Sequence, residues 1–309
     1  MKAVRYHSYG DSEVLVHEDA DRPVAGPGQV VVRVAGTGFN LLDVLIRAGV
    51  LRDAVPVTFP HVPGCDVSGV ITEVGAGVTD WREGDAVVAF LPANAPGAAA
   101  EFVAAPVEVL ARAPRSVDLA DAAALPLAGL TAWQALVEHA RLEAGQTVLV
   151  NGAGGGVGGF AVQLAVRAGA TVTATASARS HDRVRAQGAT RIVDSTATPV
   201  VDALAGQRFD VVLQLVNTTP EDTARLVDLV ADGGVLVSAT SPGPQDAGRG
   251  VRTEQVYVRS DAAQLAELVA RVDAGDLALD VTRRPLVDLP AVHDEAVTGR
   301  VSGKVVLIP

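Results

Sequence analysis

Residues 147–161 carry the sequence TVLVNGAGGGVGGFA, and this stretch decides the fold of the chain. Its first four residues, 147–150, are β-branched or apolar, which is typical of a strand buried on both faces of a parallel sheet. A glycine cluster follows, and from Gly156 onward the apolar residues predict a helix. A turn from a strand into a helix presents free N–H groups and the positive end of the helix dipole. We therefore expect an anion site here that suits a diphosphate.

The glycine cluster has the spacing of a dinucleotide-binding turn. Ala153, Gly155 and Gly158 form the pattern A-x-G-x-x-G, in which alanine replaces the first glycine of the usual fingerprint. The alternative is a tight turn that binds nothing, but it does not explain why so much backbone lacks side chains. The predicted cofactor-binding residues of this turn are Gly152, Ala153, Gly154, Gly155, Gly156, Val157 and Gly158.

The end of the next strand indicates which nicotinamide cofactor is bound. An NAD site normally carries Asp or Glu about 20 residues after the glycines, where it binds the ribose hydroxyls. This chain has Ser177 and Arg179 there, and its nearest acid, Asp182, comes later. A hydroxyl and an arginine suit a 2′-phosphate, so we predict NADPH with Ser177 and Arg179 as contacts. Arg183 is the alternative to Arg179, and both arginines could instead belong to a solvated helix face.

Composition narrows the class of protein. The 309 residues are 49% hydrophobic and carry a net charge of −11, which argues against nucleic acid or an anionic membrane as a partner. The single cysteine, Cys65, excludes an internal disulfide and a multi-cysteine zinc site. No signal segment and no uninterrupted apolar run of spanning length is present, so we expect a cytoplasmic protein.

The hydrophobic pattern changes period along the chain. Residues 1–112 contain many short strands with glycine turns, which predict a small twisted barrel. Between 147 and 258 strands alternate with helices, which predicts a parallel sheet with helices on both faces. The tail is most economically part of the N-terminal β domain. The predicted domains are therefore 1–121 with 275–309, and 122–274.

Five further motifs point to a known family. They are MKAVR (1–5), GFNLLD (38–43), PGCDVSG (63–69), LTAW (130–133) and SGKVVL (302–307). With the glycine turn, they resemble the medium-chain dehydrogenase/reductase superfamily and, within it, the zinc-free quinone oxidoreductase (zeta-crystallin-like) branch. The resemblance implies an α/β fold: a Rossmann doubly wound parallel sheet plus a GroES-like β-barrel domain, with a cleft that holds NADPH.

The resemblance also implies roles for residues outside the glycine turn. Asn40 falls where such reductases reach the nicotinamide ribose, which makes it the candidate catalytic residue. Thr131 falls where a threonine contacts the cofactor phosphates or ribose, and Lys304 matches a tail residue near the cofactor. Asn217 follows a strand of the parallel sheet, at the edge where ligands bind. Each could instead have an ordinary role in a turn, in packing or at the surface.

Two departures bear on the chemistry. The zinc alcohol dehydrogenases of this superfamily have a cysteine where this chain has Asn40, and a His-Glu pair where it has Cys65 and Asp66. His61 and Cys65 look like a metal pair, but no third ligand accompanies them, so we predict no bound metal. Many quinone reductases carry a tyrosine where this chain has Leu45, so a tyrosine at that position cannot supply a proton here.

We therefore expect an NADPH-dependent oxidoreductase that transfers hydride to a quinone or another conjugated carbonyl without zinc. The alternatives are an enoyl reductase acting on a natural-product or acyl thioester intermediate, and a non-catalytic NADPH-binding protein. Open space beside Asn40, His61 and residues 91–97 would favour an enzyme. The family also implies a homodimer paired through the edge strand predicted at 254–258.

Overall fold

The computed structural model describes residues 1–194, 196 and 198–309, which form two compact units. The first comprises Met1–Leu127 and Ser260–Pro309, and the second comprises Ala128–Arg259. The second boundary therefore lies 15 residues before the expected one at 274/275, because helix α7 (Ala262–Asp273) packs on strand β7 (Leu110–Arg112). Likewise, the first boundary lies at 127/128 rather than at 121/122.

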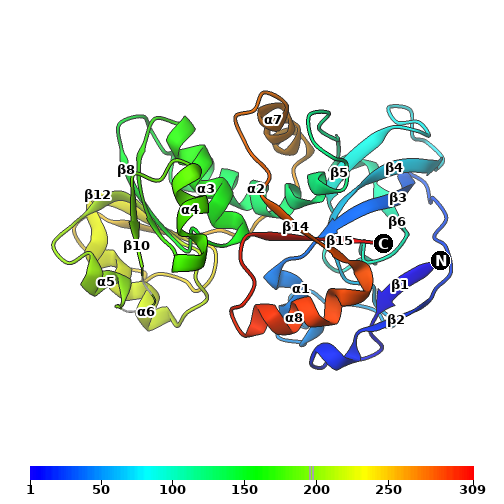
Figure 1. Cartoon of the computed structure of the whole chain (residues 1–309), viewed down its shortest axis with the longest axis horizontal. Coiled ribbons are helices and arrows are strands. Elements are labelled where there is room, and N and C mark those ends of the chain that lie inside the picture. The colour runs from blue at the N-terminus through cyan, green and yellow to red at the C-terminus, as the bar shows by residue number, and fades with distance from the viewer. Residues whose placement is uncertain (195, 197) are drawn as a thin grey trace. The chain divides into compact units, whose positions relative to one another are not determined.

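The second unit is built on a parallel sheet in the order β10-β9-β8-β11-β12-β13. In sequence order this is 3-2-1-4-5-6, the order of a doubly wound dinucleotide-binding sheet, so the predicted fold class is confirmed. Figure 1 shows α3 and α4 on one side of the sheet and α5 and α6 on the other. The strands are β8 (Thr147–Asn151), β9 (Thr171–Thr175), β10 (Arg191–Val193), β11 (Phe209–Gln214), β12 (Val230–Ser238) and β13 (Arg252–Gln255). The helices are α3 (Gly156–Arg167), α4 (His181–Ala186), α5 (Val200–Ala203) and α6 (Pro220–Arg225).

The apolar run that opens the glycine motif is the centre of this sheet. Strand β8 pairs with β9 on one side and β11 on the other, and Val148, Leu149 and Val150 are fully buried. A strand covered on both faces needs consecutive apolar residues, which is why this run does not alternate with polar ones. Before it, α2 (Pro126–Trp133) continues into a π-helix (Gln134–His139).

The first unit is β-rich and uses both ends of the chain. One sheet has the order β14-β15-β3-β4-β5-β7, with β6 paired to β3, and β1 pairs with β2 in a separate hairpin. Strand β15 lies antiparallel to β3 through Val306 and Leu307, so the tail joins the N-terminal part as expected. The strands are β1 (Lys2–Arg5), β2 (Val16–Asp19), β3 (Gln29–Gly38), β4 (Asp66–Val74), β5 (Ala86–Phe90), β6 (Phe102–Pro106), β14 (Val281–Pro285) and β15 (Lys304–Ile308).

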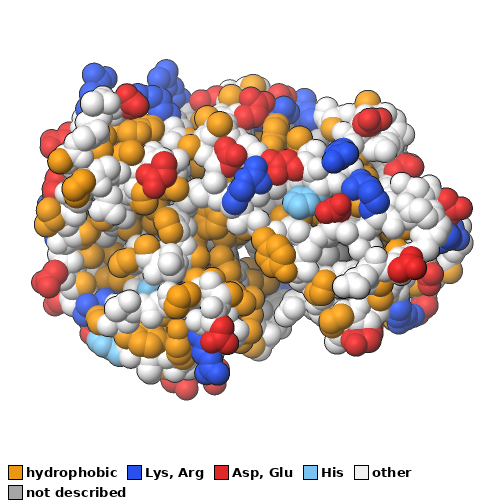
Figure 2. Space-filling model, turned by 180° about the vertical axis from the view of Figure 1, so that it is seen from behind, with side chains coloured by type: hydrophobic (Ala, Val, Ile, Leu, Met, Phe, Trp, Pro, Cys, Tyr) orange, Lys and Arg blue, Asp and Glu red, His pale blue; other side chains and the backbone are white. Residues whose placement is uncertain are grey.

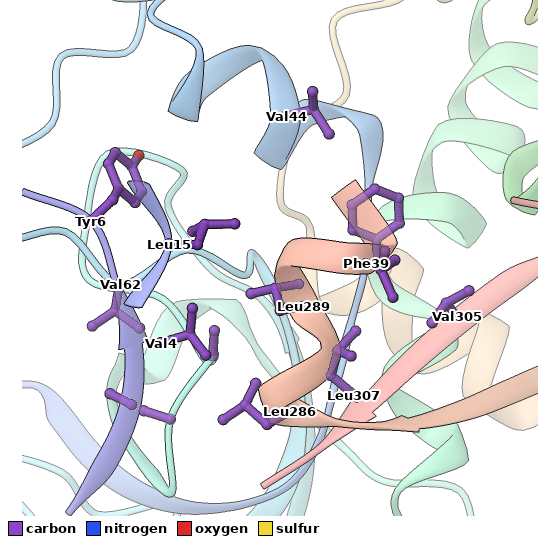
Figure 3. Packing of buried hydrophobic residues seen from close by; sticks show 14 residues of the cluster. Val4, Tyr6, Leu15, Phe39, Val44, Val62, Leu286, Leu289, Val305 and Leu307 are labelled. Atoms are coloured by element: carbon purple, nitrogen blue, oxygen red, sulfur yellow. The ribbon is translucent and has the colours of Figure 1, made fainter. Parts of the chain in front are cut away.

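A hydrophobic cluster fastens the tail to the start of the chain (Figure 3). Val4 from β1 packs with Phe39, with Leu289 of α8 (Leu289–Val297), and with Leu307 of β15. Helix α1 (Leu41–Arg47) adds Val44 to the same cluster. Burying this apolar surface compensates for the entropy lost when segments about 300 residues apart are brought together.

Helix α7 is capped by Asp261. The Asp261 carboxylate accepts a hydrogen bond from the backbone N–H of Gln264 at 3.0 Å, which makes Asp261 the N-cap. The preceding residue, Ser260, donates its hydroxyl to the Phe90 carbonyl at 2.9 Å.

On the face shown in Figure 2, acidic and basic side chains are interspersed, and no extended basic surface is visible there.

Within the described part of the chain, no helix is both long and apolar enough to cross a lipid bilayer.

Candidate functional site

The glycine turn of the second unit runs from the end of β8 into α3, as the sequence predicts. Gly152 has a φ of +101°, a conformation that side chains rarely adopt. A Cβ atom at Gly158 would lie 2.3 Å from the Gly152 carbonyl oxygen and 2.5 Å from the Ala153 Cα. The helix therefore packs directly on the turn, which is the role of the third fingerprint glycine.

The outer side of the same turn is open. A Cβ at Gly155, the N-cap of α3, would meet only the Gly152 carbonyl oxygen, at 3.5 Å. The first amides of α3 have no acceptor within the helix, and its dipole is positive at this end. The turn residues Gly152, Ala153, Gly154, Gly155, Gly156, Val157 and Gly158 thus form a backbone surface that can hold a diphosphate.

Polar side chains join three neighbouring strands at the edge that carries the glycine turn. Asn151 on β8 donates to the Gln214 side chain on β11 at 2.7 Å, and the Thr175 hydroxyl on β9 donates to Asn151 at 2.8 Å. All three side chains are buried, and Thr175 also accepts the backbone N–H of Gly152 at 2.9 Å. This network fixes the turn relative to the sheet. Our sequence analysis missed it, although a polar residue at the end of each strand was a usable signal.

The tip of β9 carries the residues predicted to choose between cofactors. Ser177 is partly buried and Arg179 is exposed on the short 3-10 helix that follows. Arg183, on α4, donates to the Gly154 carbonyl at 2.6 Å and to the Ser180 hydroxyl at 3.3 Å. Arg183 is thus hydrogen-bonded to the glycine turn, whereas Arg179 lies at the exposed end of β9.

Two further predicted contacts lie in the second unit. Thr131 is 5% exposed on α2, whereas Asn217 is exposed just after β11. Asn217 therefore follows the carboxyl end of a sheet strand, as expected.

In the first unit, Asn40 and Lys304 come together around a buried carboxylate. The Lys304 ammonium lies 3.0 Å from Asp66 Oδ2, 2.6 Å from Asn40 Oδ1 and 2.9 Å from the Phe39 carbonyl oxygen. The Asn40 amide donates to Asp66 Oδ2 at 2.9 Å and to the Gly38 carbonyl at 3.2 Å. Since both N–H groups of Asn40 are engaged, the amide would meet a ribose hydroxyl through Oδ1.

Asp66 is the residue at this site that our sequence analysis did not propose. It is fully buried, and its second oxygen accepts the backbone N–H of Leu127, in the first turn of α2, at 2.7 Å. Lys304 is 5% exposed, so the two charges form a buried ion pair. The pair was hidden in the sequence because 238 residues separate its members.

A second buried carboxylate, Asp43, lies on α1. It accepts the backbone N–H of Asn40 at 3.0 Å and that of Gly64 at 3.2 Å, and the Cys65 thiol points at it from 3.7 Å. Burial raises the pKa of Asp43 to about 6, with a further contribution from the negative charge of Asp66. Burial, followed by the Asp43 charge, also raises the pKa of the Cys65 thiol, which is therefore protonated at neutral pH.

A small hollow of about 10 Å³, room for about one water molecule, lies in the first unit. Its lining combines the polar residues Tyr6, Asp43 and His61 with apolar ones; the lining residues are 6, 43, 46, 61–65, 92, 93, 95 and 97. Burial lowers the pKa of His61 to about 4, so its ring is neutral at pH 7. The hollow lies beside His61 and residues 92–97, where open space would favour an enzyme, but it is too small to hold a quinone ring.

Metal ligands do not gather around these residues. Across residues 1–194, 196 and 198–309, no group of three or more His, Cys, Asp or Glu side chains is arranged to hold a metal ion. At Asn40 and Asp66, the positive charge is supplied by Lys304 itself.

Family models match two parts of the chain. Residues 26–115 match the alcohol dehydrogenase GroES-like domain, and residues 187–307 match a zinc-binding dehydrogenase model.

Individual relatives extend the similarity to the whole chain. A chloroplast envelope quinone oxidoreductase homologue of Arabidopsis thaliana is 38% identical over 79% of this chain and 76% of its own length. A quinone oxidoreductase of Pseudomonas aeruginosa is 30% identical over 100% of this chain and 99% of its own. The solved quinone oxidoreductase of Coxiella burnetii superposes with a TM-score of 0.89 at 27% identity, covering 100% of this chain and 99% of that one.

Proposed function

Because the chain belongs to the quinone oxidoreductase branch of the medium-chain dehydrogenase/reductase superfamily, and is thus an oxidoreductase, we propose that it transfers hydride from NADPH to a quinone or another conjugated carbonyl without zinc. The observation that carries this proposal is the Lys304 ammonium, 2.6 Å from Asn40 and 3.0 Å from Asp66. Asn40 stands where the zinc dehydrogenases have a metal-binding cysteine. A zinc ion would need lone pairs that already bind the ammonium, and two cations that close would repel each other.

The proposed reaction uses no metal ion as a Lewis acid, and this favours conjugated carbonyls over plain ketones as acceptors. Hydride addition to a plain ketone produces a localised alkoxide, which needs a metal or a well-placed donor. Addition to a quinone or enone produces a delocalised phenolate or enolate, which needs less local stabilisation.

The residues present fit a nicotinamide cofactor. The open glycine turn would hold the diphosphate, and Ser177 with Arg179 would hold the 2′-phosphate. Asn40 Oδ1 would accept from the nicotinamide ribose, and Thr131, Asn217 and Lys304 are the remaining proposed contacts. When bound, the cofactor supplies the hydride.

The acceptor class predicts a clear order of rates. With a naphthoquinone, an enone and a saturated ketone in parallel, NADPH oxidation should be about 100-fold slower or more for the saturated ketone. Dialysis against EDTA should leave the quinone rate unchanged, and an enoyl thioester in the same assay tests the alternative substrate class. A saturated-ketone rate equal to the quinone rate, or loss of activity with the removal of bound zinc, would contradict the mechanism. A protein that binds NADPH but reduces none of these acceptors would favour the non-catalytic alternative.

The cofactor preference predicts a difference between two arginines. An arginine–phosphate hydrogen bond is worth roughly 1.5–3 kcal/mol, or about 10- to 150-fold in affinity. Arg179→Ala should weaken NADPH binding by that factor and leave NADH binding nearly unchanged. Arg183→Ala is the matched comparison and should weaken both cofactors, because Arg183 supports the Gly154 carbonyl of the turn. Isothermal titration of the two variants with NADPH and with NADH measures these affinities. If Arg179→Ala lost affinity equally for NADPH and NADH, Arg179 would not be the contact of the 2′-phosphate.

A homodimer is the proposed assembly. Strand β13 is the last strand of the parallel sheet and pairs with β12. The nearby Tyr257 is 80% exposed. An exposed strand edge beside an exposed aromatic ring favours pairing across a twofold axis. Light scattering at micromolar concentration should give twice the chain mass, and Tyr257→Asp should lower it; a monomeric mass for the unaltered chain would reject the dimer.

A further inference from the structure

Asp66, Asn40 and Lys304 close a ring of hydrogen bonds. Asp66 Oδ2 accepts from the Asn40 amide at 2.9 Å and from the Lys304 ammonium at 3.0 Å. The same ammonium donates to Asn40 Oδ1 at 2.6 Å. All three residues are buried, with exposed fractions of 0, 8 and 5% respectively. Each side chain therefore has both of the others as partners, and none can turn without breaking two of the bonds.

The charges in this ring decide which way round the Asn40 amide lies. A carboxylate only accepts hydrogen bonds, and an ammonium only donates them. Turning the amide over would place its NH2 group against the Lys304 ammonium and its oxygen against the Asp66 carboxylate, which would break two charge-assisted hydrogen bonds. The second N–H of the amide donates to the Gly38 carbonyl at 3.2 Å. Asn40 Oδ1, which keeps a second lone pair, is therefore the atom left for a ribose hydroxyl.

The fold leaves room for the Asp66 carboxylate at the end of β3. A Cβ atom at Gly38 would lie 2.8 Å from Asp66 Oδ2 and 2.4 Å from the Ala123 carbonyl oxygen. The strand can approach Asp66 this closely because residue 38 has no side chain. The other carboxylate oxygen accepts the backbone N–H of Leu127 at 2.7 Å. The position of Asp66 is thus fixed by backbone on two sides.

The main chain of Asn40 is held as firmly as its side chain. Asn40 is the N-cap of α1, and its backbone N–H donates to the Asp43 carboxylate at 3.0 Å. A side chain that is already fixed in this way loses little conformational entropy when a ligand binds to it.

We propose that Asp66 is a positioning residue: it holds the Asn40 amide, directly and through Lys304, so that Asn40 Oδ1 is presented to the nicotinamide ribose. The proposal rests on the proposed function for the contact between Asn40 and the cofactor. Because Asp66 is fully buried, it acts on the ribose through Asn40. The position of the ribose sets the distance from the nicotinamide ring to the acceptor, and an error of about 1 Å can slow a reaction about 100-fold.

The kinetic test is Asp66→Asn, which keeps the size of the side chain but gives it N–H donors. In a single turnover of bound NADPH with a naphthoquinone, the rate constant should fall about tenfold or more. The Kd for NADPH should rise at most about fivefold, the worth of one neutral hydrogen bond. A loss of folded protein would instead lower the amount of bound NADPH and leave the rate constant unchanged.

Asp85→Asn is the matched control. Asp85 is also a buried carboxylate of the first unit, but it pairs with Arg112, at 3.4 Å. Its single-turnover rate constant and its Kd for NADPH should equal those of the unaltered protein.

A nuclear magnetic resonance measurement needs no turnover. The chain contains four asparagines, at positions 40, 94, 151 and 217. Labelling asparagine with 15N therefore gives four side-chain NH2 signals, and Asn40→Asp identifies one of them. The Asn40 protons should exchange with solvent about tenfold faster or more in Asp66→Asn, and NADP+ should shift their signal in the unaltered protein. Asn151, which donates to Gln214 in the second unit, is the internal control and should exchange at the same rate in both proteins.

The outcomes separate this proposal from the proposed function. An unchanged single-turnover rate constant, an unchanged exchange rate of Asn40, or an equal acceleration at Asn40 and Asn151 would each overturn the role of Asp66. If NADP+ leaves the Asn40 signal of the unaltered protein in place while quinone reduction proceeds, the positioning role fails and the proposed reaction stands. If the unaltered protein reduces no conjugated acceptor, but NADP+ shifts the Asn40 signal and Asp66→Asn abolishes this shift, the proposed reaction fails and the role of Asp66 stands.

Discussion

Replacing Lys304 with methionine should lower the free energy of unfolding by about 3–5 kcal/mol. The variant keeps most of the side-chain volume but leaves Asp66, which is fully buried, without its positive partner. Asp66 would retain hydrogen bonds from Asn40 and Leu127, but these do not supply a compensating charge. Urea unfolding followed by circular dichroism measures the loss.

An exposed ion pair provides the matched control. Lys2 lies 3.0 Å from Asp19, the same distance as in the buried pair, but the two side chains are 53% and 83% exposed. Lys2→Met should therefore cost at most about 1 kcal/mol. Adding Asp66→Asn to Lys304→Met should recover part of the stability, because it removes the unpaired charge. If Lys304→Met costs no more than Lys2→Met, the buried pair is not what stabilises this part of the fold.

The second large effect is expected at Gly158. In Gly158→Ala the new methyl carbon would lie 2.3 Å from the Gly152 carbonyl oxygen, and neither the turn nor α3 can move aside without breaking its packing. We expect a loss of about 3 kcal/mol or slightly more, at the upper end for overpacking a tight site, together with loss of cofactor binding. Thermal unfolding and titration with NADPH measure the two effects.

Gly155→Ala separates stability from binding in the same turn. The Cβ there would meet only one atom, at 3.5 Å, and the residue has a φ of −88°, which alanine adopts freely. Its stability should fall by no more than about 1 kcal/mol, because alanine is a poorer N-cap than glycine, while NADPH should bind more weakly, because the methyl group occupies the side of the turn proposed for the diphosphate. Tight NADPH binding by Gly155→Ala would place the diphosphate elsewhere, and a fully stable Gly158→Ala would refute the packing argument.

The sequence by itself determined the architecture of the second unit. Strand and helix patterns alternate between 147 and 258, and right-handed connections leave few ways to arrange them. The glycine turn could be located to the residue, because only glycine tolerates the +101° φ of Gly152 and the close helix contact at Gly158. The joining of the tail to the N-terminal part was also predicted, since a strand-like end needs a sheet to pair with.

Only the tertiary structure decided which polar side chains meet. Lys304 reaches Asn40 across 264 positions in the sequence, and nothing in the sequence indicated that Asp66 binds both. The assignment of α7 to the first unit was equally hidden. The physical reason is the same in each case. Local patterns report which face of an element is buried, whereas the partner of a buried polar group depends on how distant segments pack around it.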